Sequence, residues 1–145
     1  TLSVGALSDG GSIAVSARQT DAAGNLGSAS ATTRKDATAP TVVFSSPVAE
    51  PTRISSIPVT VTFSEAVSGF DVQRLVVTNA TVSAFTLVSG TVYTFILTPV
   101  SNGVVTVALA DGAVLDAAGN GNTTVPQFRR TYAPRTQVYL PLLRR

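Results

Sequence analysis

The chain has 145 residues and a formal net charge of +2, and it contains no cysteine, histidine, methionine or tryptophan. Without imidazole or thiol groups it can form no Ser-His-Asp triad, no cysteine nucleophile and no zinc site built on histidine or cysteine. Charged residues make up only 12 % of the sequence, so few groups remain for catalysis. We therefore expect a protein that is not an enzyme.

Composition predicts an all-β protein. Residues that favour strands dominate, whereas Glu and Lys, which are common on surface helices, occur only as Glu50, Glu65 and Lys35. No apolar stretch approaches the roughly 20 residues of a membrane-spanning helix. The first residues also lack the charged and apolar regions of a signal peptide, so we expect an internal or processed piece of a longer protein.

The N-terminal segment is predicted to hold three strands, at residues 2–7, 12–20 and 28–34. Three strands are too few to close a core between two sheets. Unpaired strand edges are prone to pair with other chains. We therefore expect an open edge here that exposes Ile13, Val15 and Leu26.

The following segment alternates apolar and polar residues in the manner of half-buried strands. Val59, Val61 and Phe63 fall on one face, as do Tyr93, Phe95 and Leu97 of a later strand. Asn102-Gly103 predicts a tight hairpin turn. Seven short strands separated by turns are typical of a β-sandwich; they are predicted at residues 41–46, 57–64, 74–78, 81–88, 91–98, 104–109 and 124–132.

An internal repeat indicates how the chain is divided. The pentapeptide DAAGN occurs at residues 21–25 and again at 116–120, and each copy is followed by Ala-Pro, at Pro40 and Pro134. The separation of 116 − 21 = 95 residues is about the size of one immunoglobulin-like sandwich. We infer a partial unit at residues 1–39, a complete domain at 40–134 and a tail at 135–145.

The run from Val59 to Asn122 closely resembles the bacterial Ig-like domains that are repeated in tandem in large surface proteins and adhesins. The segments that carry the resemblance are TFSEAVSGF, DVQRLVVTNATVSAF, YTFILTP and DGAVLDAAGNGN. The earlier TDAAGNLGSASATTRKDATAP is similar to the end of another such domain and its junction. The resemblance implies a seven-stranded immunoglobulin-like β-sandwich, preceded by a three-stranded partial unit, in an extracellular module with no catalytic role.

Calcium is the cofactor that the resemblance suggests. In related arrays, junctions hold Ca²⁺ through aspartates of DxxGN-type loops and of the linker, which correspond here to Asp21, Asn25 and Asp36. Calcium takes six or more oxygens, so backbone carbonyls and water would have to complete the shell. The alternative, which we favour, is that Asp21 and Asn25 only close a tight turn around Gly24. A site at Asp116 is expected even less, because Tyr132 stands where the first copy has its junction aspartate.

Basic charge is concentrated after Asp116, where no acidic residue follows. Five arginines lie in this part of the chain: Arg129, Arg130, Arg135, Arg144 and Arg145. A basic end of this kind can contact anionic wall polymers, lipid headgroups or an acidic neighbouring subunit. We do not expect nucleic acid as a partner, because no nucleic-acid-binding module is recognisable.

The tail at residues 135–145 is a short apolar segment that ends in two arginines. It is similar to the YLPL-type endings of some secreted multidomain bacterial proteins, which implies a sorting or anchoring signal. So apolar a segment is expected to dock on a partner. The residues predicted to make this interaction are Val138, Tyr139, Leu140, Leu142, Leu143, Arg144 and Arg145.

Three functions fit these observations. The favoured one is a non-catalytic structural or adhesion module of a bacterial surface or secreted protein, located outside the cell and in contact with neighbouring Ig-like repeats or surface polymers. The second is a filament subunit, in which copies of the chain complete one another by β-strand pairing. The third is an accessory domain of a secreted hydrolase.

Overall fold

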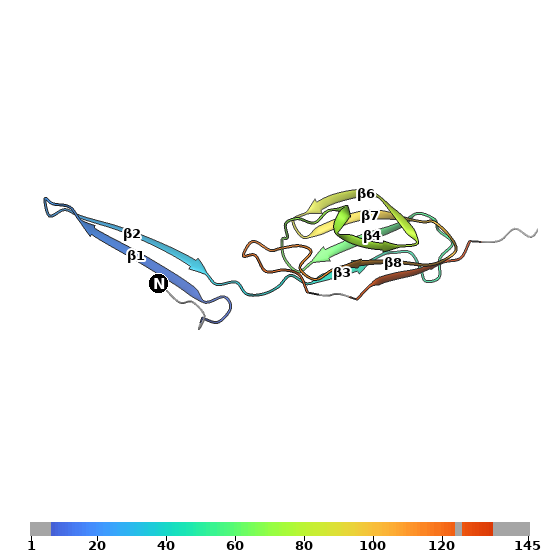
Figure 1. Cartoon of the computed structure of the whole chain (residues 1–145), viewed down its shortest axis with the longest axis horizontal. Helices are drawn as coiled ribbons and strands as arrows, with labels where there is room; N and C mark the ends of the chain where they lie inside the picture. Colours follow the sequence, from blue (N-terminus) through green and yellow to red (C-terminus); the bar gives the residue numbers. More distant parts are fainter. Residues whose placement is uncertain (1–6, 124–125, 135–145) are drawn as a thin grey trace, which may run out of the picture. The chain divides into compact units, whose positions relative to one another are not determined.

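The structure is a computed structural model that describes residues 7–123 and 126–134. Contacts divide the chain into two compact units, Thr1–Thr38 and Ala39–Arg145. Strands dominate both units, and the described residues contain no α-helix (Figure 1). The all-β class predicted from composition is confirmed.

The N-terminal unit is built around one antiparallel hairpin. Strand β1 (Ser12–Thr20) pairs with β2 (Leu26–Arg34) in unbroken register, from Ser12 opposite Arg34 to Thr20 opposite Leu26. The further strand predicted at residues 2–7 falls almost wholly outside the described residues. Val15 and Leu26 are 48 % and 64 % exposed, as expected for an open edge. A two-stranded ribbon buries too little apolar surface to be stable by itself.

The C-terminal unit is a sandwich of two antiparallel sheets, as predicted. One sheet has the order β3-β4-β7-β6 and the other β5-β8-β9. A short 3₁₀ helix, η1 (Val72–Arg74), leads into β5. The strands of the sandwich are β3 (Val42–Ser45), β4 (Ile57–Phe63), β5 (Leu75–Thr78), β6 (Ala80–Ser89), β7 (Val92–Pro99), β8 (Gly103–Leu109) and β9 (Phe128–Tyr132).

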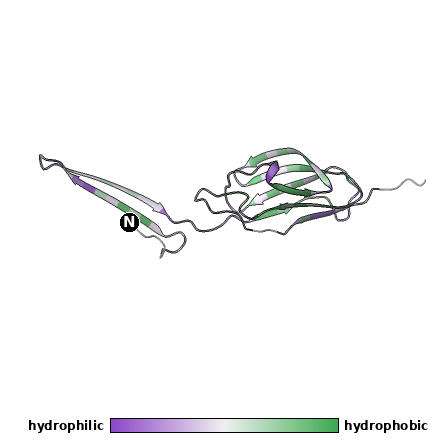
Figure 2. Cartoon of the chain, viewed as in Figure 1, coloured by the Kyte–Doolittle hydropathy of each residue, from purple (hydrophilic) through white to green (hydrophobic). Residues whose placement is uncertain are grey.

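Alternating residues of both sheets form the core between them. The predicted inward faces of β4 and β7 are confirmed: Val59, Val61 and Phe95 are at most 1 % exposed. The same strands show the green of hydrophobic residues in Figure 2. Phe70, predicted to lie in a loop, is also only 8 % exposed. Its ring meets that of Tyr93 edge-on, with centroids 4.8 Å apart, a favourable geometry for aromatic pairs.

The last strand and the connection between β3 and β4 differ from the prediction. Strand β9 begins at Phe128, although the sequence pattern placed its start at residue 124. Thr52, which lies between predicted strands, forms a parallel bridge to Tyr132. The chain therefore pairs with β4 along β3 and then crosses to the other sheet, where Thr52 lies beside β9.

Strand β6, an edge of the larger sheet, is interrupted by an irregularity. Its register with β7 shifts between Ser83 and Thr86 and again between Leu87 and Ser89. Ala84 has φ 50°, a left-handed backbone conformation that is uncommon for any residue with a Cβ atom. These features are those of a β-bulge, which increases local twist and disrupts the ladder.

Candidate functional site

The two DAAGN loops have the same conformation. In the first, Oδ1 of Asp21 accepts the backbone N–H groups of Ala23 and Asn25, both at 2.9 Å, and Oδ2 accepts the side-chain amide of Asn25 at 2.9 Å. Gly24 has φ 89°. The turn interpretation of this loop accounts for every one of these bonds, because each oxygen of Asp21 satisfies donors of its own loop.

The second loop repeats this pattern around Asp116. Its Oδ1 accepts the backbone N–H groups of Ala118 and Asn120, both at 2.8 Å, and its Oδ2 accepts the amide of Asn120 at 2.7 Å. Gly119 has φ 92°. The loops differ in burial, since Asp116 is 5 % exposed whereas Asp21 lies at the exposed tip of its hairpin.

The N-terminal unit does not bring its three predicted calcium ligands together. Asp21 and Asn25 lie at the tip of the β1–β2 hairpin, and Asp36 follows the opposite end of β2. Strand β2 has nine residues, which at about 3.4 Å each separate the tip from Asp36 by roughly 30 Å. Asn25 also turns its amide N–H₂ group toward Asp21, whereas calcium would need the amide oxygen there.

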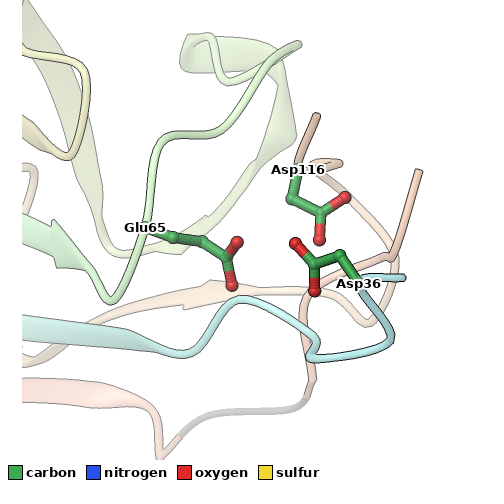
Figure 3. A group of neighbouring side chains, drawn as sticks. All are labelled: Asp36, Glu65 and Asp116. Atoms are coloured by element: carbon green, nitrogen blue, oxygen red, sulfur yellow. The ribbon is translucent and has the colours of Figure 1, made fainter. Parts of the chain in front are cut away.

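Within the sandwich, two carboxylates that are far apart in sequence approach each other. Glu65, at the end of β4, and Asp116 have oxygens within 4.8 Å of one another, and Figure 3 shows both side chains. Figure 3 also draws Asp36, which belongs to the N-terminal unit. Sequence reasoning missed the pair of Glu65 and Asp116, because nothing in the spacing of these residues indicates which loops the two sheets place side by side.

Hydrogen bonds hold four carboxyl groups in their ionised form. Burial raises the pKa of Asp116, but bonds from Asn120, Ala118 and Gly119 outweigh it and hold the pKa below its usual value. Asn25 has the same effect on the pKa of Asp21, and Thr38 on that of Asp9. Hydrogen bonding from Thr131, helped by nearby arginines, lowers the pKa of Glu50.

Replacing Asp116 by alanine is expected to lower the melting temperature of the sandwich clearly. The change removes a carboxylate that is 5 % exposed and leaves the partly buried N–H groups of Ala118 and Asn120 without their acceptor. Asp21→Ala is the matched control, because it removes the same bonds from the exposed copy. Thermal unfolding followed by circular dichroism compares the two variants. Asp21→Ala should leave the sandwich transition unchanged, because Asp21 lies in the other unit. An equally unchanged transition in Asp116→Ala would contradict a structural role for the buried copy.

Removing divalent cations tests the pair of Glu65 and Asp116 directly. We expect an unchanged melting temperature in excess chelator, since the turn already supplies donors to both oxygens of Asp116. A cation bound only to the folded state would stabilise it, and chelation would then lower the melting temperature. Such a fall, reversed by Ca²⁺ and absent in Glu65→Gln, would assign a cation to this pair.

The lowered pKa values predict loss of stability in acid. Asp and Glu ionise in unfolded chains near 3.8 and 4.5, and Asp116 and Glu50 hold their protons less tightly when folded. The unfolded state therefore binds more protons, so their contribution is present above about pH 4.5 and is lost as pH falls through the folded pKa values. Melting temperatures measured from pH 7 to pH 2.5 should fall less steeply in the double variant Glu50→Gln, Asp116→Asn than in the parent.

A second arrangement joins the beginning of the sandwich to its end. Thr52 donates its N–H to the carbonyl of Thr131 at 2.8 Å, and Ala133 donates its N–H to the carbonyl of Thr52 at 2.8 Å. Next to these bonds along both segments, the N–H of Thr131 donates to Oε2 of Glu50 at 2.7 Å. A glutamate side chain thus takes the place of a backbone acceptor in a parallel strand pair.

Arg130 strengthens the same junction from the opposite strand. Its Nε donates to the carbonyl of Val48 at 2.9 Å, and its guanidinium lies 4.6 Å from the centroid of Phe128. The sequence prediction grouped Arg129 and Arg130 together in the basic end of the chain. Only Arg129 is exposed, whereas Arg130 is half-buried, because alternate residues of β9 point to opposite faces. We call residues 48–52 and 130–133 the crossover clamp.

The predicted interaction residues of the tail lie outside the described residues. They are Val138, Tyr139, Leu140, Leu142, Leu143, Arg144 and Arg145. In the part of the chain that the structure describes, no helix has the length and apolar character required to cross a membrane.

Comparison with known families gives one match. The sequence model of a family described as bacterial Ig-like domain matches residues 36–132. No curated protein matches the chain. The matched range contains both sheets of the sandwich and leaves out the β1–β2 hairpin.

Proposed function

The chain belongs to the family of bacterial Ig-like domains, and from this we propose that it is a structural or adhesion module of a bacterial surface or secreted protein, located outside the cell. Members of the family are generally non-catalytic. The observation that carries the proposal is the path of the chain through the sandwich. It enters at one end, ahead of β3, and leaves at the opposite end after β9 (Figure 1), which suits a module placed in series with others.

Surface exposure on the producing bacterium tests this proposal. Antibodies raised against the purified chain should label intact cells or the culture medium, and protease added to intact cells should remove the cell-bound signal. A cytoplasmic protein of the same cells, detected in parallel, is the control for lysis. Labelling that appears only after the cells are broken would contradict an extracellular module.

The β1–β2 hairpin supports a further proposal about domain organisation. We propose that residues 1–39 are the closing part of a preceding Ig-like repeat. The support is the DAAGN loop, whose five hydrogen bonds and positive glycine φ recur in the complete sandwich. In both copies the residues just before and after the loop pair with each other, as Thr20 with Leu26 and as Leu115 with Gly121.

A filament subunit is the second candidate, and the same hairpin favours it. The register places Ile13, Val15 and Ala17 on one face of the ribbon, opposite Ala29 and Ala31, so one side is apolar. Copies of the chain could cover this face or add strands to its edges. Sedimentation and negative-stain microscopy of the purified chain at high concentration separate the candidates: a monomer removes the filament, and ordered fibres support it.

Calcium stays a proposal tied to the family resemblance. Its support within the sandwich is limited to the approach of Glu65 to Asp116, and the chelator experiment above tests it. The predicted tail interaction is likewise a proposal. Deletion of residues 135–145 should abolish retention at the cell surface if the tail is an anchoring signal.

A further inference from the structure

The crossover clamp joins the segment that follows the first strand of the sandwich to the last strand. The chain enters the unit ahead of β3 and leaves it after β9, at the opposite end (Figure 1). Thr52 and Tyr132 pair in parallel. When the entering strand and the leaving strand are pulled away from each other, the bonds between them lie across the direction of the pull.

This orientation determines how the bonds would break. In a parallel pair pulled from opposite ends, the hydrogen bonds are loaded together and the strands must slide past each other. In the β1–β2 hairpin, by contrast, Ser12 and Arg34 are neighbours at the open end. Tension that separates those two residues breaks the bonds of the ribbon one after another. The two units of the chain therefore respond to force differently.

We propose that the crossover clamp is the part of the sandwich that resists force along the chain, and that the Glu50 carboxylate and the Arg130 guanidinium act in it as side-chain substitutes for strand hydrogen bonds. The inference deepens the proposed structural role and rests on it. Between Thr52 and Ala133 the strands themselves exchange only two backbone bonds. Glu50 adds a third connection at 2.7 Å, and Arg130 a fourth, at 2.9 Å to the carbonyl of Val48.

The charges of Glu50 and Arg130 suit these side-chain hydrogen bonds to resisting the sliding of the two segments past each other. A bond in which the donor or the acceptor is ionised is shorter and stronger than a neutral one, and here the carboxylate accepts from a backbone N–H while the guanidinium donates to a backbone carbonyl. The two residues reach in opposite directions, Glu50 from the crossover to β9 and Arg130 from β9 to the crossover. Sliding of either strand must break both.

Single-molecule force spectroscopy tests the proposal on the full chain, placed between marker domains of known unfolding force. We expect an early extension at low force as the hairpin opens, and a later event at higher force as the sandwich unfolds. Residues 40–134 span roughly 310–340 Å when fully extended, which identifies the second event. Glu50→Ala and Arg130→Ala should each lower the force of that event, whereas Glu50→Gln, which keeps an acceptor oxygen, should lower it less.

Two controls separate mechanical resistance from ordinary stability. Arg129→Ala removes the same charge from the adjacent, exposed position of β9 and should leave the unfolding force unchanged. Ile57→Val trims a fully buried side chain of β4 that lies outside the clamp. Ile57→Val is compared with the clamp variant whose urea unfolding midpoint is nearest to its own, so that the two variants have lost similar equilibrium stability. The clamp variant should lose more force than Ile57→Val at equal loss of equilibrium stability.

The outcomes decide between the alternatives. Equal force losses in clamp and core variants, or an unfolding force insensitive to both Glu50→Ala and Arg130→Ala, would overturn the clamp. Circular dichroism of each variant verifies folding, and the milder Glu50→Gln keeps the test open if an alanine variant does not fold. Because the measurement involves no cell surface, its failure leaves the extracellular role standing. Failure of the labelling experiment leaves the mechanical result standing.

Discussion

Phe95→Ala is expected to lower the free energy of unfolding of the sandwich by about 3–5 kcal/mol, the usual cost of deleting a large aromatic side chain from a core. Phe95 lies on β7, between β4 and β6, and is 1 % exposed. Its ring stacks on that of Phe85 with centroids 6.3 Å apart. The unbroken register with β4 holds β7 in place, so the space left by the ring should stay largely unfilled as a cavity.

Urea unfolding followed by circular dichroism measures this loss as a shift of the midpoint. For a domain of this size each kcal/mol corresponds to about 4–8 °C in melting temperature, so thermal unfolding should shift by well over 10 °C. Leu87→Ala, at a side chain 59 % exposed on β6, is the control and should change stability by no more than about 0.5 kcal/mol. A small effect of Phe95→Ala would mean that the two sheets are not packed as described.

Asn122→Ala is expected to cost about 2–4 kcal/mol, because it leaves buried backbone groups without partners. Asn122 is 2 % exposed. Its Oδ1 accepts the N–H of Val114 at 3.0 Å, and its Nδ2 donates to the carbonyl of Ala110 at 2.9 Å. One side chain thus fastens the long connection between β8 and β9 to the end of β8.

Asn122→Asp sharpens the test. Aspartate keeps an acceptor for Val114 but brings a second oxygen against the carbonyl of Ala110, so it should destabilise at least as much as alanine. Asn102→Ala, in the exposed turn between β7 and β8, is the control and should be nearly neutral. If Asn122→Asp proved as stable as the parent, the hydrogen bond from Asn122 to the carbonyl of Ala110 would contribute nothing to the free energy of unfolding.

The strands could be predicted because their residues alternate. The prediction for β1 agrees with the structure residue for residue, and those for β4 and β7 agree to within one residue at each end. Each of these strands has one apolar and one polar face or a clear turn at its end. Strand β9 starts later than predicted, because Pro126 and Gln127, which the prediction included, are not part of the pairing with β8, which begins at Phe128.

The junctions could not be predicted, because they depend on partners far away in sequence. Glu50 and Arg130 form bonds to segments about 80 residues distant, and nothing local distinguishes Arg130 from Arg129. Phe70 and Asn122 likewise lie in stretches that are rich in turn residues, and only the assembled sheets show that both are buried. The turn at Asp21, in contrast, follows from the residue types alone, since Asp, Gly and Asn supply every group that it uses.

The bulge in β6 has a consequence for proteins in which such domains follow one another. Neighbouring domains on one chain are held at local concentrations that can reach the millimolar range, and similar strands at such proximity risk pairing with each other during folding. Ala84, with its left-handed backbone, interrupts the hydrogen-bonding row that β6 would otherwise offer along its free side. The bulge in this one edge strand would in this way favour strand pairing within each domain over pairing with strands of the neighbouring domain.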